Sequence, residues 1–153
     1  MQVDLSLIKK YDVSGPRYTS YPTALQFEES SDEQYRRVVG SLTRQDPLSL
    51  YLHIPFCNTL CYYCACNKIV TRDKSRAETY LSYLYREIEM VSELYGRRQV
   101  LQLHWGGGTP TFIDDDQILD LSRHLRQHFS FGSDQDGEFS IEIDPRTVDP
   151  GRI

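Results

Sequence analysis

The pattern of apolar residues most constrains the fold of this chain, because its period changes several times along the sequence. Residues 48–54, 101–105 and 139–143 alternate apolar with polar side chains, which is typical of strands with one buried face. Residues 75–95 and 115–129 instead place apolar side chains at steps of three and four, which predicts amphipathic helices. Strands that alternate with helices of this length favour parallel pairing with right-handed crossovers. We therefore expect an α/β fold with a parallel sheet.

Local signals mark the ends of the predicted helices. Ser75 and Glu78 match the capping-box pattern before the longer helix, and Gly96 stands where a left-handed C-terminal cap belongs. The same pattern, beginning at Ser31, predicts an earlier helix over about residues 33–45.

The first 47 residues differ in character from the rest. Residues 15–23 contain two prolines and two tyrosines, so they can form neither a regular helix nor a central strand, and we expect an extended arm. We accordingly expect an N-terminal arm and helix over residues 1–47, followed by an α/β core over residues 48–153.

Composition narrows the classes of function. The chain has 17 Lys and Arg against 22 Asp and Glu, a net charge of -5, which argues against binding nucleic acid or an anionic membrane through bulk positive charge. No apolar run approaches the roughly 18 to 20 residues that span a bilayer, and the N-terminus lacks the pattern of a secretory signal. We therefore expect a cytoplasmic protein with neither nucleic acid nor membrane as a partner.

All four cysteines lie in one short segment, spaced Cys57-x3-Cys61-x2-Cys64-x-Cys66. A disulfide framework spreads its cysteines along the chain, so this clustering indicates metal or redox chemistry. Structural zinc sites usually take two pairs of ligands from separated segments, whereas one loop can wrap an iron–sulfur cluster. The spacing thus favours a cluster over a zinc module or redox-active thiols. For Cys66 alone, a small buried hydrophobe is the alternative.

Three unusual segments follow the three predicted strands. They are the cysteine loop, the glycine run 106–108 and the acidic segment 142–144. In parallel α/β folds, reactive groups collect at the C-terminal ends of the strands, so we expect these segments to meet. Glycines there would let a ligand approach the backbone and would offer it amide donors, although a plain tight turn explains them equally well.

These motifs resemble those of the radical S-adenosylmethionine superfamily. The three-cysteine spacing on the loop after the first strand, with an aromatic residue before the third cysteine, is similar to its cluster motif. The resemblance implies that three cysteines hold a [4Fe-4S] cluster and that S-adenosyl-L-methionine binds its remaining iron. One electron from the cluster then cleaves the carbon–sulfur bond to give a 5′-deoxyadenosyl radical. It also implies the first three βα units of a partial TIM-type barrel.

Longer stretches are similar to the oxygen-independent coproporphyrinogen III oxidase family. They run in order along nearly the whole chain: residues 15–23, 50–57, 61–68, 104–111 and 142–146. This resemblance implies oxidative decarboxylation of coproporphyrinogen III propionates to vinyl groups, which gives protoporphyrinogen IX in haem biosynthesis. It further implies a porphyrinogen substrate, an electron donor such as a flavodoxin or ferredoxin, and a monomer at full length.

The same resemblance implies roles for individual residues. Cys57, Cys61 and Cys64 would ligate the cluster. The residues that would contact the first S-adenosylmethionine are Tyr51, Gly107, Gly108, Thr109 and Glu142. Tyr63 would lie beside a second molecule of it. No catalytic side chain is assigned.

The haem chaperones of the same superfamily are the alternative function. They usually have an aromatic residue at the position of Cys66 and lack the segment 15–23, so both features favour the oxidase.

Several other polar residues have simpler interpretations. For Arg17, Lys68 and Arg72, solvated surface charge is favoured over contact with the substrate's propionates. His53 and His104 are expected to be hydrogen-bonded neutral groups of the core.

Three parallel strands cannot close a barrel, and the last would leave an open edge. The chain also stops at residues 149–153, where a further helix should begin. We therefore expect a fragment of a larger barrel, with low stability and no turnover by itself.

Overall fold

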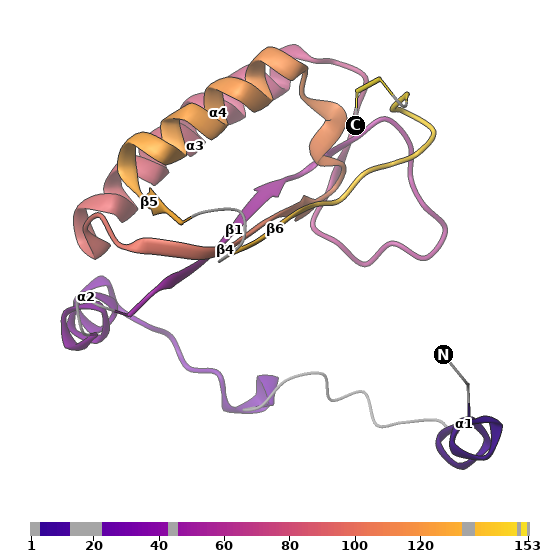
Figure 1. Ribbon diagram of the computed structural model, residues 1–153, viewed down its shortest axis with the longest axis horizontal. Helices are drawn as coiled ribbons and strands as arrows, with labels where there is room; N and C mark the ends of the chain where they lie inside the picture. Colours follow the sequence, from indigo (N-terminus) through magenta and orange to yellow (C-terminus); the bar gives the residue numbers. More distant parts are fainter. Residues whose placement is uncertain (1–3, 13–22, 43–45, 133–136, 150, 153) are drawn as a thin grey trace. The chain divides into compact units, whose positions relative to one another are not determined.

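The computed structural model describes residues 4–12, 23–42, 46–132, 137–149 and 151–152. The chain divides into two compact units, residues 1–35 and 36–153. In chain order the elements are α1 (Leu5–Tyr11), η1 (Ala24–Gln26), α2 (Asp32–Ser41), β1 (Leu48–Ile54), β2 (Phe56–Cys57), β3 (Ile69–Val70), α3 (Ser75–Tyr95), β4 (Gln99–Gly107), η2 (Pro110–Phe112), α4 (Asp115–His128), β5 (Ser130–Phe131) and β6 (Glu138–Ile141) (Figure 1). Except for Thr23, the arm expected over residues 15–23 lies outside the described residues.

The N-terminal helices begin with side-chain caps. Asp4 accepts hydrogen bonds from the backbone of Ser6 and begins α1, a helix that the sequence pattern did not predict. At α2, the Gln34 amide donates to the Ser31 hydroxyl (3.2 Å) and the Gln34 side chain accepts from the Ser31 backbone (2.8 Å). The predicted capping box is therefore confirmed, but α2 ends at Ser41, before the expected end near residue 45.

The main sheet is parallel, as predicted. Strand β4 lies at its centre, with β1 on one side and β5 and β6 on the other. The short strand β5 was not predicted. The register places Tyr51 of β1 opposite His104 of β4, and His104 opposite Ser140 of β6. All three strands that carry the expected site therefore point their C-terminal ends toward the same edge of the sheet.

Helices α3 and α4 both pack on one face of this sheet (Figure 1). The core between helices and strands includes these residues of β1, α3, β4 and α4: Leu52, Ile54, Ala77, Leu81, Leu84, Ile88, Val100, Trp105, Leu121 and Leu125. The apolar faces predicted for both helices are thus confirmed. The other face of the sheet carries polar side chains and aromatic rings, and α3 and α4 do not cover it.

The helix ends show one wrong prediction and one confirmed one. Ser75 is the first residue of α3 rather than its cap, and Asp73 accepts bonds from the Ser75 amide (3.0 Å) and hydroxyl (2.7 Å). Asp73 lies two residues closer to the N-terminus, where its side chain reaches the free donors of the first turn. Gly96 does close α3, with a φ of 71° and its N–H bonded to the Ser92 carbonyl at 2.8 Å.

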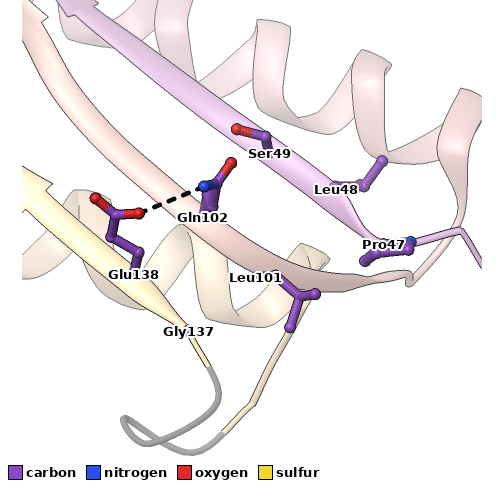
Figure 2. Close-up of a pocket in the computed structure, with 7 residues that line it drawn as sticks. All are labelled: Pro47, Leu48, Ser49, Leu101, Gln102, Gly137 and Glu138. Atoms are coloured by element: carbon purple, nitrogen blue, oxygen red, sulfur yellow. Dashed lines mark hydrogen bonds between the residues drawn. The ribbon is translucent and has the colours of Figure 1, made fainter.

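The start of β4 contains an irregularity that changes which face each side chain occupies. Leu48 pairs with Val100, but Ser49 pairs with Gln102, so Leu101 is an extra residue in the ladder. Leu101 lines a hollow of about 450 Å³ at the starts of the strands. Figure 2 shows Gln102 reaching toward Glu138 there, with a hydrogen bond of 3.4 Å.

The last predicted strand is shorter than expected. Strand β6 ends at Ile141, and both Ile141 and Ile143 are exposed rather than buried. Among the described strands, β6 pairs only with β4, so its other backbone edge is unpaired in this part of the chain. Within the described residues, no helix combines the length and apolar character needed to cross a membrane.

Gly108 packs so closely against the chain after β1 that we expect it to tolerate no side chain. A Cβ there would lie 2.7 Å from the Pro55 carbonyl and 2.8 Å from the Phe56 oxygen, both backbone atoms. We expect Gly108→Ala to lower the free energy of unfolding by about 1–3 kcal/mol. Thermal or urea unfolding, followed by the fluorescence of Trp105, measures this change.

Gly40→Ala is the matched control, because a Cβ in that turn of α2 meets nothing within 4 Å. We expect it to be neutral or stabilising by up to about 1 kcal/mol. Equal stability of Gly108→Ala and the unmodified chain would contradict the close approach.

Candidate metal and cofactor site

The three segments expected to meet do meet, at the C-terminal ends of β1, β4 and β6. They line a cavity of about 650 Å³. Its walls include all four cysteines, together with Tyr62, Tyr63, Lys68, Gly107, Gly108, Thr109, Glu142, Asp144 and Arg146. The cavity thus contains all of the predicted site residues except Tyr51.

The cysteine loop is closed at its base by a second, two-stranded parallel sheet that the sequence pattern did not predict. Strand β2 pairs with β3, so residues 58–68 form a loop with fixed ends. The Ile69 amide donates to the Pro55 carbonyl (2.7 Å), and the Thr71 amide donates to the Cys57 carbonyl (2.9 Å). These bonds hold the loop against the end of β1.

All four cysteines are free thiols, but their environments differ. Cys57 is buried, Cys61 and Cys64 are half-buried, and Cys66 is exposed. The alternative of a small buried hydrophobe at Cys66 is therefore wrong. Cys66 follows Cys64 on the outer part of the loop, where no core element covers it. A hydrogen bond with Cys64 raises the pKa of the Cys66 thiol, and the charge of Cys64 acts in the same direction.

Gly107 presents its backbone to the cavity. Its φ of 114° lies in the region that side chains disfavour, and a Cβ would stand 2.8 Å from the His53 ring. Its amide donates to Glu142 Oε2 at 3.3 Å. Glu142 in turn continues the ladder beyond β6, because its own amide donates to the Trp105 carbonyl at 2.9 Å. The strand ends therefore bring a backbone amide and a carboxylate together inside the cavity.

His104 positions Glu142 from the open face of the sheet. Its Nε2 lies 3.4 Å from Glu142 Oε1, and its Nδ1 lies 2.7 Å from the Ser140 hydroxyl. Because a carboxylate only accepts, the ring donates through Nε2, and in the neutral imidazole Nδ1 accepts the Ser140 proton. His104 is hydrogen-bonded as expected, but it is not a core residue, since its side chain is 41% exposed.

Tyr51 belongs to the same open face rather than to the cavity wall. Its ring stacks on His104 at 5.7 Å, and its hydroxyl lies 3.1 Å from His53 Nδ1. His53 Nε2 donates to the Asn67 carbonyl (2.8 Å), so Nδ1 accepts from the Tyr51 hydroxyl. Burial raises the pKa of the Tyr51 phenol, and the charge of Glu142 adds to the effect.

Arg146 is a site residue to which the sequence assigned no role. Its guanidinium bonds both oxygens of Asp144, at 2.8–3.2 Å, and one nitrogen lies 3.8 Å from Cys61 Sγ. These hydrogen bonds hold the pKa of Asp144 below its usual range. The signal available in the sequence was the pair of opposite charges just after a strand end.

The remaining residues discussed from the sequence lie at the mouth of the cavity, on the surface or outside the described residues. Tyr63 lines the cavity mouth and is 91% exposed. Lys68 is half-buried and donates to the Cys66 carbonyl at 3.2 Å, so it is tied to the loop rather than freely solvated. Arg72 is exposed, and Arg17 lies outside the described residues.

Comparison with known proteins agrees with this geometry. Residues 51–153 match the radical SAM superfamily. The chain is 52% identical over 149 residues to the oxygen-independent coproporphyrinogen III oxidase of Pseudomonas aeruginosa, covering 95% of this chain and 32% of that protein. It is 52% identical over 143 residues to the protein of the same name from Mannheimia haemolytica, covering 93% of this chain and 96% of that sequence.

The fold agrees as well. A solved structure of coproporphyrinogen III oxidase from Escherichia coli, described as a radical SAM enzyme, superposes with a TM-score of 0.79 at 48% identity. The match covers 97% of this chain and 32% of that chain, so this chain spans about a third of its length. The expected α/β fold and family are confirmed. The chain therefore belongs to the radical SAM superfamily and, within it, to the oxygen-independent coproporphyrinogen III oxidase family.

Proposed function

We propose that Cys57, Cys61 and Cys64 hold a [4Fe-4S] cluster, and that the facing wall of the cavity binds S-adenosyl-L-methionine. One observation carries this proposal: three free thiols share a cavity with a backbone amide that already binds a carboxylate. We also propose that residues 48–153 form the part of the barrel that carries this site, and that residues 1–47, which include α1 and α2, precede that part as a separate N-terminal region.

The donor set fits a cluster with three protein ligands. Cys57 is anchored in β2, while Cys61 and Cys64 lie on one turn, where the Cys64 amide donates to the Cys61 carbonyl at 3.2 Å. The Thr109 hydroxyl lies 3.5 Å from Cys57 Sγ and Arg146 lies 3.8 Å from Cys61 Sγ, so two of the three sulfurs have donors. Hydrogen bonds to ligating sulfurs stabilise the reduced state of such clusters. Cys66, exposed on the outer loop, stays outside the ligand set.

The wall opposite the thiols suits an amino acid group. The amide of Gly107 offers a donor to a carboxylate, as it already does to Glu142. The amides of Gly108 and Thr109 donate to the Ile54 and Phe56 carbonyls, at 2.8 Å each, so these two residues would line the ligand through their other atoms. The Glu142 carboxylate, oriented by His104, would accept hydrogen bonds from an ammonium group. Tyr51, on the neighbouring strand β1, stacks on His104 and so helps to hold the ring that orients Glu142. Tyr63, at the rim, would lie beside a second S-adenosylmethionine.

We further propose that the complete protein oxidatively decarboxylates the propionates of coproporphyrinogen III, giving the vinyl groups of protoporphyrinogen IX. When bound, the cofactors supply the one-electron chemistry that starts this reaction. The chain's own residues hold and orient them and exclude water from the buried side at Cys57. We also propose a flavodoxin or ferredoxin as electron donor, a monomeric state and a cytoplasmic location.

The ligand assignment predicts a clear difference among the cysteines. We expect Cys57→Ser, Cys61→Ser and Cys64→Ser each to abolish cluster assembly, because each removes one of three thiolate ligands. Cys66→Ser is the matched control and keeps the cluster. Iron and sulfide content and visible absorption after anaerobic reconstitution measure the outcome. Tight zinc binding without any cluster in the unmodified chain would instead support a zinc module.

The role of Glu142 predicts a loss of cofactor affinity. We expect Glu142→Gln to weaken S-adenosylmethionine binding by about 10- to 100-fold, because it removes a hydrogen bond to a charged group. Equilibrium binding to the reconstituted chain, normalised to cluster content, measures this change. Glu138→Gln, in the distant hollow of Figure 2, is the control and should bind as the unmodified chain does. Equal affinity of the two variants would exclude Glu142 from the binding site.

The substrate assignment is tested by a chimera. This chain replaces the matching third of the Escherichia coli relative, and we expect the chimera to convert coproporphyrinogen III to vinyl-containing product at a rate comparable with the parent. The same chimera with Cys64→Ser should be inactive. Tight haem binding without vinyl product would favour the haem chaperone instead.

A further inference from the structure

A second group of metal-binding side chains lies on the helix layer, apart from the proposed cofactor site. His124 and His128 are one turn apart on α4, and Glu89 faces them from α3. One ligand atom from each residue lies within 4.8 Å of the others. His128 is the last residue of α4, so the group lies near β5, at the opposite end of the sheet from the cysteine loop (Figure 1).

The distances between the ligand atoms of these three side chains are close to those around a bound zinc ion. His124 Nε2 lies 3.7 Å from Glu89 Oε1, and the two imidazole centroids are 4.6 Å apart. Zinc bonds of about 2.0–2.1 Å in a tetrahedron place ligand atoms roughly 3.4 Å apart, so only small side-chain rotations are needed. The Glu89 side chain is 52% exposed and free to make that adjustment, whereas the His124 side chain is 18% exposed.

The hydrogen bonds around His128 leave its Nε2 lone pair free to bind a metal. The Ser92 hydroxyl donates its single proton to the Glu89 carbonyl at 2.8 Å. The same oxygen lies 3.0 Å from His128 Nδ1, so it must accept there, and His128 donates through Nδ1. The lone pair of the neutral ring is therefore on Nε2. Hydrogen bonds of this type orient the histidine ligands of metal sites.

His124 is held from the same face of α3. Its Nε2 lies 3.3 Å from the Tyr85 carbonyl, and the Tyr85 ring meets the imidazole edge-on at 4.8 Å. A metal held between His124 Nε2 and Glu89 would require the other tautomer of the neutral ring, so the proton that now bonds Nε2 to this carbonyl would be carried by Nδ1 instead. The position also suits a cation, because the negative end of the α4 dipole is nearby.

We propose that Glu89, His124 and His128 form a divalent metal site of the zinc class that links α3 to α4. Two imidazoles and one carboxylate are ligands that zinc favours, and the half-exposed position leaves room for water as the fourth ligand. A metal bound only to the folded chain stabilises it by mass action. This inference uses none of the residues of the proposed cofactor site and does not depend on it.

The test is a titration of the unmodified chain with Zn²⁺, followed through the imidazole nitrogen resonances in NMR spectra. The chain has four histidines. His53 and His104 lie beside the cysteine cavity and report any zinc held there, whereas the two rings on α4 report the proposed site. We expect saturable shifts at His124 and His128. Absence of shifts at both rings up to about 1 mM zinc would overturn the proposal.

Variants show whether the three residues act together. We expect His124→Gln and His128→Gln each to weaken zinc binding at the remaining ring by more than about tenfold. Removing even a group that only hydrogen-bonds a metal ligand lowers metal affinity by about 10- to 100-fold. Gln127→Ala, exposed on the same helix, is the matched control and should bind zinc normally. Zinc should raise the unfolding temperature of Gln127→Ala by more than it raises that of His128→Gln. Equal affinity in all variants would contradict the site.

Discussion

The parallel pairing of β4 with β1 and β6 is the constraint on which the rest of the structure depends. Parallel strands have their C-terminal ends at the same edge of a sheet, so the loops that follow them lie close together. In this chain the register opposes Ile54 to Gly107 and Trp105 to Ile141, which brings the cysteine loop, the glycines and Glu142 to one cavity. A shift of one residue in either pairing would move these side chains to the other face.

The two faces of the sheet differ in function: one packs in the core, and the other carries polar side chains next to the proposed site. One face buries Leu52, Ile54 and Trp105 under the two helices, and this packing holds the strand ends in place. The other face carries a connected polar set in which Tyr51 stacks on His104 and His104 bonds Glu142. Every member of that set has a partner, which is the condition under which a polar network rigidifies a site instead of weakening it.

The chain separates two kinds of metal-binding chemistry. Cysteine thiols, which are soft ligands, gather on a loop at one end of the sheet, where Cys57 is buried and hydrogen bonds close the loop base. Borderline imidazole and carboxylate ligands lie near the other end, on the seam between α3 and α4.

Sequence periodicity by itself determined helices α3 and α4, the three main strands and the parallel pairing, because these follow from local patterns of apolar and polar residues. The cysteine spacing, together with the resemblance of the neighbouring motifs, identified the family. Only the tertiary structure decided which side chains touch: the bond of Asp73 to Ser75 at the start of α3, the contact of Arg146 with Cys61 and the exposure of Cys66. It also joined Glu89 to two histidines of another helix. Such contacts depend on register and packing between distant segments, which no local period encodes.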